Sequence, residues 1–245
     1  MLTMLGPHNV PTDANENYHS HPGGGNVGPV SHAEHFRPPQ QARSRESLRK
    51  VLTSAEHVLS TYGIDEFTVA AVAEHAGMSV GAIYRRFTGK EQLLQAVKEQ
   101  LLEQLETSVA DALRSARPGL GGTISAFTHA MAQTFSHHAR TFPELLSGQR
   151  AEGVERGLQA LAVIQRSLTE AAKPYLDGIR GRDPEQALNA AARTVIGSCV
   201  HRAATCQSWP DGLSWTTWAD ETTEIAMAYL ATEASTQKKN RRSPE

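Results

Sequence analysis

Cationic and hydroxyl side chains come together in one short stretch of the chain. Tyr84, Arg85 and Arg86 are consecutive, and Lys90 follows Arg86 by four residues. An arginine guanidinium can donate two hydrogen bonds to one guanine, while a lysine ammonium or a tyrosine hydroxyl can bind a phosphate oxygen. These residue types at this spacing favour contact with a nucleic acid.

The residues before this stretch have the spacing that two closely crossing helices need. Small Ala73 is followed four residues later by Gly77 and six residues after that by apolar Ile83. This arrangement is typical of a helix-turn-helix, in which one helix braces the next across a tight turn. An ordinary corner between two helices remains the alternative on this spacing alone.

The elements that position these residues are all expected to be helical. An apolar stripe with a 3.6-residue period starts after residue 44: Leu48, Val51, Leu52, Ala55, Val58, Leu59 and Tyr62. Gly63 ends this helix, and Thr68 and Ser79 each offer a capping hydroxyl to a following short helix. A longer helix from Lys90 stops before Pro118, and further helices are expected at about 121–139, 142–148, 152–176, 184–207 and 214–234. No strand pattern appears, so the fold class is all-α.

A family resemblance is carried by the residues around this turn. The stretch that resembles the DNA-binding signature of the TetR family is Phe67-Thr68-Val69, Val72-Ala73-Glu74-His75-Ala76-Gly77-Met78-Ser79-Val80-Gly81-Ala82-Ile83-Tyr84-Arg85-Arg86-Phe87 and Thr88-Gly89-Lys90-Glu91-Gln92-Leu93-Leu94. The resemblance covers about residues 44–97. It implies an N-terminal three-helix helix-turn-helix DNA-binding domain at 42–89 and a C-terminal helical-bundle domain for ligand binding and dimerisation at 90–235. Composition predicts a disordered arm at 1–41 and a disordered tail at 236–245.

The resemblance also implies individual DNA contacts. Residues 80–86 would form the recognition helix, with Arg85 reading guanine and Tyr84 reaching a phosphate. Arg86 would share in base reading with Arg85, and the alternative is that it contacts a phosphate or carries a solvated charge. The complete expected set is Arg43, Arg45, Thr68, Ser79, Val80, Gly81, Ala82, Tyr84, Arg85, Arg86 and Lys90.

The middle helices of the regulatory part are expected to enclose a small apolar or amphipathic effector. The expected lining is Phe127, Met131, Phe135, His138, Leu161, Gln165, Leu168 and Arg202. The polar members would contact the effector or form internal hydrogen bonds, since a buried polar group needs a partner. His129, Gln133 and His137 recur every four residues on the opposite face, which predicts a solvated face more strongly than a metal site.

The last two helices resemble the dimer interface of the family. Helices 184–207 and 214–234 would pair with those of a second copy and place two recognition helices one DNA turn apart, on a palindromic operator. The implied protein is a dimeric repressor that a small molecule releases from DNA. A helical protein-interaction adaptor and a TetR-like activator without a ligand are the alternatives.

The bulk composition sets limits on other functions. A net charge of −2 gives no overall attraction to nucleic acid, so any binding must come from local basic clusters. The sequence shows no nucleophile paired with a base, no paired carboxylates in a cleft pattern and no phosphate-binding glycine loop. We therefore expect no enzymatic activity, no cofactor and no metal site. With no long apolar run and no signal pattern, we expect a cytoplasmic, nucleoid-associated protein. If Cys199 and Cys206 share a helix, they are too far apart for a disulfide with each other. Buried, inert thiols are expected, and redox sensing or a bridge between subunits is the alternative.

Overall fold

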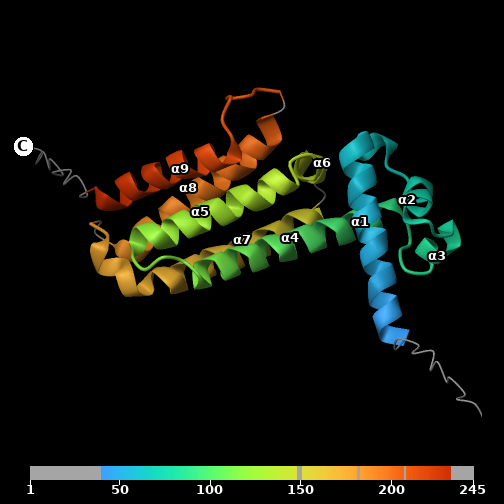
Figure 1. Cartoon of the computed structure of the whole chain (residues 1–245), viewed down its shortest axis with the longest axis horizontal. Helices are drawn as coiled ribbons and strands as arrows, with labels where there is room; N and C mark the ends of the chain where they lie inside the picture. The colour runs from blue at the N-terminus through green and yellow to red at the C-terminus, as the bar shows by residue number, and fades with distance from the viewer. Residues whose placement is uncertain (1–39, 148–150, 181–182, 207, 233–245) are drawn as a thin grey trace, which may run out of the picture. The chain divides into compact units, whose positions relative to one another are not determined.

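The structure is a computed structural model that describes residues 40–147, 151–180, 183–206 and 208–232, and every regular element in these ranges is helical (Figure 1). The all-α prediction is therefore confirmed. The elements are α1 Gln40–Glu66, α2 Val69–Ala76, α3 Val80–Tyr84, α4 Lys90–Arg114, α5 Leu120–His137, α6 Thr141–Ser147, α7 Ala151–Ala172, the 3₁₀ helix η1 Lys173–Gly178, α8 Pro184–Thr205 and α9 Trp215–Ala231. The expected tail and nearly all of the expected arm lie outside the described residues.

Helix α1 is the brace of the N-terminal part. Most of its predicted apolar stripe is buried, with Val51, Ala55 and Leu59 fully covered, but Tyr62 at its end is 57% exposed. The helix begins at Gln40, earlier than the sequence pattern predicted, because glutamine, alanine and arginine are good helix formers. Gly63 interrupts it with φ 77° and ψ 176°, and a last helical turn follows.

Helices α2 and α3 meet at the predicted tight turn. Thr68 Oγ1 accepts a hydrogen bond of 3.1 Å from Ala71 N, and Ser79 Oγ accepts one of 3.1 Å from Ala82 N, so both predicted hydroxyl caps form. Gly77 lies between the helices with φ 58°, in the left-handed region that glycine enters without strain. Ile83 is fully buried, and α3 packs against α2. The helix-turn-helix therefore has the expected packing.

The remaining helices form a bundle around an apolar core. Helix α5 packs against α9 and α4, and α4 packs against α7 (Figure 1). Phe127 and Met131 of α5 are fully buried in this core. Asp183 and Ser214 cap α8 and α9 by accepting hydrogen bonds from backbone N–H groups three residues further on.

Three side chains connect α1 to the bundle. Glu144 of α6 accepts a hydrogen bond of 2.9 Å from Ile64 N, and Lys90 Nζ donates one of 2.6 Å to Ile64 O. His138, directly after α5, pairs through Nδ1 with Glu56 of α1. Helix α1 is therefore held at its end by groups from α4 and α6 and further back, at Glu56, by His138.

Candidate functional site

Helix α3 presents its polar and small residues to solvent. Ile83 turns inward, whereas Val80 is 40% exposed and Tyr84 is 53% exposed. Gly81 and Arg85 are exposed as well. The face that was expected to enter a DNA groove is open to a partner.

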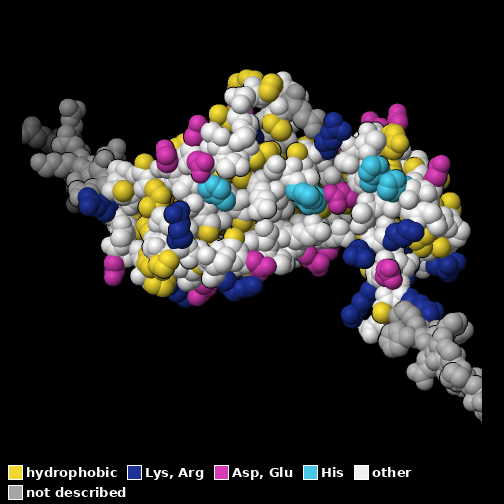
Figure 2. Space-filling model, viewed as in Figure 1, with side chains coloured by type: hydrophobic (Ala, Val, Ile, Leu, Met, Phe, Trp, Pro, Cys, Tyr) yellow, Lys and Arg dark blue, Asp and Glu magenta, His cyan; other side chains and the backbone are white. Residues whose placement is uncertain are grey.

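Two basic segments that are distant in the sequence lie together beside this face. Arg86 Nη2 donates hydrogen bonds to the backbone oxygen of Ser44 at 3.2 Å and to its hydroxyl at 3.0 Å. This contact brings the end of α3 next to Arg43 and Arg45, which are both exposed on α1. Figure 2 shows Lys and Arg side chains gathered around this half of α1 and the neighbouring turn. The local clusters therefore combine into one positive surface, although the net charge of the chain is negative.

Some expected DNA contacts have an internal partner in this structure. Lys90 is half-buried and its ammonium holds Ile64 O, so a phosphate contact would compete with that hydrogen bond. Arg86 holds Ser44 while remaining exposed. The oxygens of Thr68 and Ser79 serve as helix caps, with both residues at the surface. The DNA contacts of all four residues stay predictions.

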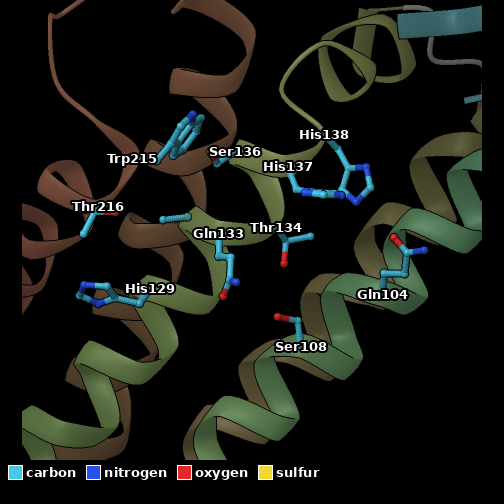
Figure 3. A pocket seen from close by; sticks show the side chains of 11 residues that line it. Gln104, Ser108, His129, Gln133, Thr134, Ser136, His137, His138, Trp215 and Thr216 are labelled. Carbon is cyan, nitrogen blue, oxygen red and sulfur yellow. The ribbon is translucent and has the colours of Figure 1, made fainter. Parts of the chain in front are cut away.

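A groove opens between α4, α5 and the start of α9, with a volume of about 810 Å³ (Figure 3). Gln104 and Ser108 project from α4, opposite Gln133 and Thr134 of α5 (Figure 3). The complete lining is Gln104, Ser108, His129, Ala132, Gln133, Thr134, Ser136, His137, His138, Trp215 and Thr216. A second hollow of about 540 Å³ shares Ser108, His129 and Gln133, so the depression continues along α4 and α5.

Most of the residues expected to line an effector cavity do not line this groove. Of that set, His138 alone lines the groove. The buried apolar members, which pack in the core because they fill the spaces between helices, are Phe127, Met131, Phe135 and Leu168, with Leu161 half-buried against them. Their effector contacts stay predictions, and each would require a displacement in the core.

The two other polar members form internal contacts. Gln165 Nε2 donates a 2.8 Å hydrogen bond to Asn189. The buried guanidinium of Arg202 pairs with Asp211, donates to Leu213 O at 2.8 Å and lies 4.8 Å from the centre of the Trp215 ring. Their positions match the alternative of internal hydrogen bonds.

The polar face of α5 was not predicted to be part of a groove. His129, Gln133 and His137 lie on that face and line the depression, although a solvated face was expected. The sequence shows their four-residue spacing, but it does not show that α4 and α9 lie on either side of them. In the described part of the chain, no group of three or more His, Cys, Asp or Glu side chains is placed to hold a metal ion.

His138 lines the groove and also contacts α1. Its ring is 9% exposed, pairs with Glu56 and contacts the Phe142 ring edge-on at 6.0 Å between centres. His137 stands edge-on to it at 4.9 Å. One imidazole therefore borders the groove and also binds the helix that braces the helix-turn-helix.

The cysteines are free thiols, with Cys199 buried and Cys206 half-buried. Burial raises the pKa of the Cys199 thiol far above its ordinary value, so this thiol stays protonated and unreactive. Among the described helices, none is long and apolar enough to cross a membrane.

An exposed short helix on a helix-turn-helix, flanked by arginines and joined to a helical bundle, defines a DNA-binding transcriptional regulator. Residues 51–97 match the family described as bacterial regulatory proteins, tetR family. Residues 51–97 are therefore similar to the DNA-binding region of this family of transcriptional regulators.

Individual relatives agree with this assignment. The uncharacterized HTH-type transcriptional regulator TtgW of Pseudomonas putida is 26% identical over 57% of this chain and 96% of its own length. The HTH-type transcriptional repressor AcnR of Corynebacterium jeikeium is 36% identical over 25% of this chain, a match that spans 33% of the repressor. The crystal structure of the regulator FadR from Bacillus subtilis in complex with stearoyl-CoA has the same fold, with a TM-score of 0.60 at 16% identity. That likeness covers 74% of this chain and 98% of the FadR chain.

Proposed function

We propose that this protein is a dimeric repressor that binds a palindromic operator through α3 and is released by a small amphipathic molecule bound in its C-terminal domain. The observation that carries the proposal is the exposed face of α3 beside the joined basic segments at Ser44 and Arg86. The proposal keeps the domain division expected from the sequence, with the DNA-binding part at 42–89 and the regulatory part at 90–235. The protein then acts at the bacterial chromosome, in the cytoplasm, and its role includes no catalytic step.

The proposed DNA contacts divide into base readers and phosphate binders. Arg85 reads a guanine, and Val80 or Ala82 contacts a thymine methyl group. Gly81 allows close approach of the backbone. The proposed phosphate contacts, which position the protein without reading sequence, are Arg43, Arg45, Thr68, Ser79, Tyr84, Arg86 and Lys90.

Exposed faces of α8 and α9 support the proposed dimer. Ile225 is 66% exposed and Tyr229 is 51% exposed on α9, while Gly197 and Ala204 expose small side chains on α8. Small residues let helices of a second copy approach closely, and large apolar residues gain free energy when covered. A two-fold interface here would pair two recognition helices for a palindromic site.

The regulatory domain supports a ligand-controlled mechanism. The groove along α4 and α5 has a volume within the range of small-molecule sites, and it has both polar and apolar lining residues. FadR of Bacillus subtilis, which shares the fold, was crystallised with stearoyl-CoA, an amphipathic molecule. A ligand that binds the DNA-free conformation more tightly would shift the population away from DNA.

In vitro selection from random DNA tests the proposal directly. The full chain should enrich a palindrome, and its affinity should fall steeply with added salt because bound cations release counterions. Arg85→Ala should weaken binding to the selected site by about tenfold or more, the value of one bidentate base contact. The matched control is Arg166→Ala, an exposed arginine on α7, which should bind like the parent. Selection of no sequence, or binding insensitive to salt, contradicts the proposal.

A further inference from the structure

The groove contains polar side chains that have no partner within the described protein. Gln104 and Ser108 of α4 and Gln133 and His137 of α5 line it, and none forms a side-chain hydrogen bond to another described residue. In Figure 3 the α4 pair projects across the opening toward α5. Four groups able to donate hydrogen bonds therefore surround one space of about 810 Å³.

The uncharged hydrogen-bond donors that line the groove suit an anionic ligand. No Asp, Glu, Lys or Arg is among its lining residues. The nearby carboxylates of Glu56 and Asp220 are each already bound to an imidazole, the second at 3.0 Å from His129 Nε2. Among the described lining residues and these two neighbours, a cation would therefore find no free carboxylate, whereas a carboxylate ligand would meet amide, hydroxyl and imidazole donors.

His138 is the imidazole in the groove for which a ligand would compete with a carboxylate of the protein, that of Glu56. His129 already has both ring nitrogens engaged, with Nδ1 2.8 Å from Ser125 O and Nε2 bonded to Asp220. His138 instead uses Nδ1 for Glu56, and the same side chain lines the groove. A ligand carboxylate at this end would offer His138 the same kind of acceptor that Glu56 now provides.

We propose that this groove binds a small organic carboxylate and that the ligand competes with Glu56 for His138. The apolar part of such a ligand has Trp215 and Ala132 beside it. The inference rests on the proposed ligand-controlled repressor and names the chemical class of its effector and the contact through which the effector acts.

Loss of the Glu56 pair would reach the DNA-binding part through α1. Glu56 lies on the same helix as Ser44, which holds Arg86 at the end of α3. Without that pair, the backbone contact of Ile64 with Glu144 and Lys90 still holds the end of α1, while its middle is freer to move against the bundle. Binding of ligand and of DNA would then oppose each other, and thermodynamic linkage requires the effect to be equal in both directions.

The first test measures the ligand class without any DNA. Benzoate is titrated into the full chain while the histidine ring signals are followed by NMR, and benzamide serves as the uncharged probe of the same shape. We expect benzoate to bind at least about tenfold more tightly, since hydrogen bonds to a charged group are the stronger ones. The signals of His137 and His138 should shift most. Equal binding of benzoate and benzamide overturns the proposal.

Variants locate the binding site. Gln133→Leu and His137→Phe change exposed groove residues and should each weaken benzoate binding about tenfold, the value of one lost charge-assisted hydrogen bond. The matched control is Gln159→Leu, an exposed glutamine on α7 outside the groove, which should bind benzoate like the parent. If the control loses as much affinity as the groove variants, the ligand binds elsewhere and the proposal fails.

The second test addresses the role of Glu56. In Glu56→Gln the competing charge is removed, so benzoate should bind several-fold more tightly, and it should release DNA from the parent but not from the variant. Glu56→Asp keeps the charge on a shorter side chain and serves as the second variant if the first fails to fold. Benzoate affinity that is unchanged in both folded variants overturns the competition. A parent that selects no DNA refutes the proposed repressor instead, and the NMR titration still decides the site.

Discussion

Adjacent arginines at the end of α3 have different surroundings. Arg86 is tied to Ser44 through two hydrogen bonds, whereas the exposed Arg85 forms no side-chain hydrogen bond or ion pair within the described protein. A guanidinium that is free of partners can align with a base edge, while one that is bound to α1 has part of its donor set occupied. We therefore infer that Arg85 confers specificity and that Arg86 sets the position of α1 at the DNA backbone.

This difference predicts distinct binding defects for the two arginines. Arg86→Ala should weaken binding to selected and random DNA by similar factors and reduce the slope of log affinity against log salt by about one, as expected for one lost phosphate contact. Arg85→Ala should instead reduce the ratio of specific to random affinity. Fluorescence anisotropy at several salt concentrations measures both quantities. If Arg86→Ala lost specificity and Arg85→Ala weakened binding to all DNA equally, Arg86 would be the base reader and Arg85 the phosphate contact.

Gly81 gives a second test at the level of a single residue. A Cβ atom at this position would meet no atom within 4 Å, so the fold itself has no need of glycine there. Gly81→Ala should keep or slightly raise the free energy of unfolding, because alanine favours a helix, but it should weaken DNA binding. Circular dichroism melts and anisotropy give the two measurements. Gly77→Ala is the contrasting variant, since φ 58° makes it destabilising. Unchanged DNA affinity in Gly81→Ala would argue against close backbone approach.

At the scale of the elements, the caps and the periodicity made most helices predictable. Thr68 and Ser79 precede apolar residues that return with a helical period, and both form the expected caps. Helix α2 ends before Gly77 as predicted, and α4 begins at Lys90 as predicted and ends at Arg114, before Pro118. The early start of α1 at Gln40 was less predictable, since its first turns have no buried stripe.

The groove was not predictable from the same patterns. Periodicity shows that His129, Gln133 and His137 share one face of α5, but it carries no information on which helices stand beside that face. Phe127 and Met131 were expected in a cavity, and they fill the core instead because apolar side chains on facing helices interdigitate. A site formed between helices depends on tertiary packing, so its residues cannot be selected from one helix.

The cap of α2 allows a quantitative prediction for an element. Thr68→Ala removes the oxygen that accepts from Ala71 N and should reduce the free energy of unfolding by about 1 kcal/mol. Because α2 supports α3, DNA binding should weaken as well. Urea denaturation followed by circular dichroism gives the stability. Thr107→Ala, an exposed threonine within α4, is the control and should change stability by less than about 0.5 kcal/mol. Equal losses in both variants would show that the cap has no special role.

At the scale of the whole molecule, the proposed DNA recognition depends on a second copy of the chain. One α3 helix offers a single arginine for base reading, and its first three residues are valine, glycine and alanine. A single helix of this kind distinguishes poorly between DNA sequences. Two copies held in fixed register multiply their binding constants, since the second helix meets its half-site at a high effective concentration. The proposed interface on α8 and α9 is therefore as necessary for recognition as α3.

Disruption of that interface should abolish operator binding without changing α3. Ile225→Glu places a charge on the exposed apolar face of α9, where it would have to be buried without a partner in a dimer. We expect light scattering to show monomers and operator affinity to fall by at least about 100-fold through loss of the bivalent effect. Leu158→Glu, at a residue that is 60% exposed on α7, is the matched control and should remain a dimer that binds the operator. If Ile225→Glu stayed dimeric while Leu158→Glu dissociated, the interface would lie on α7, and the two recognition helices would be paired by a different face of the bundle.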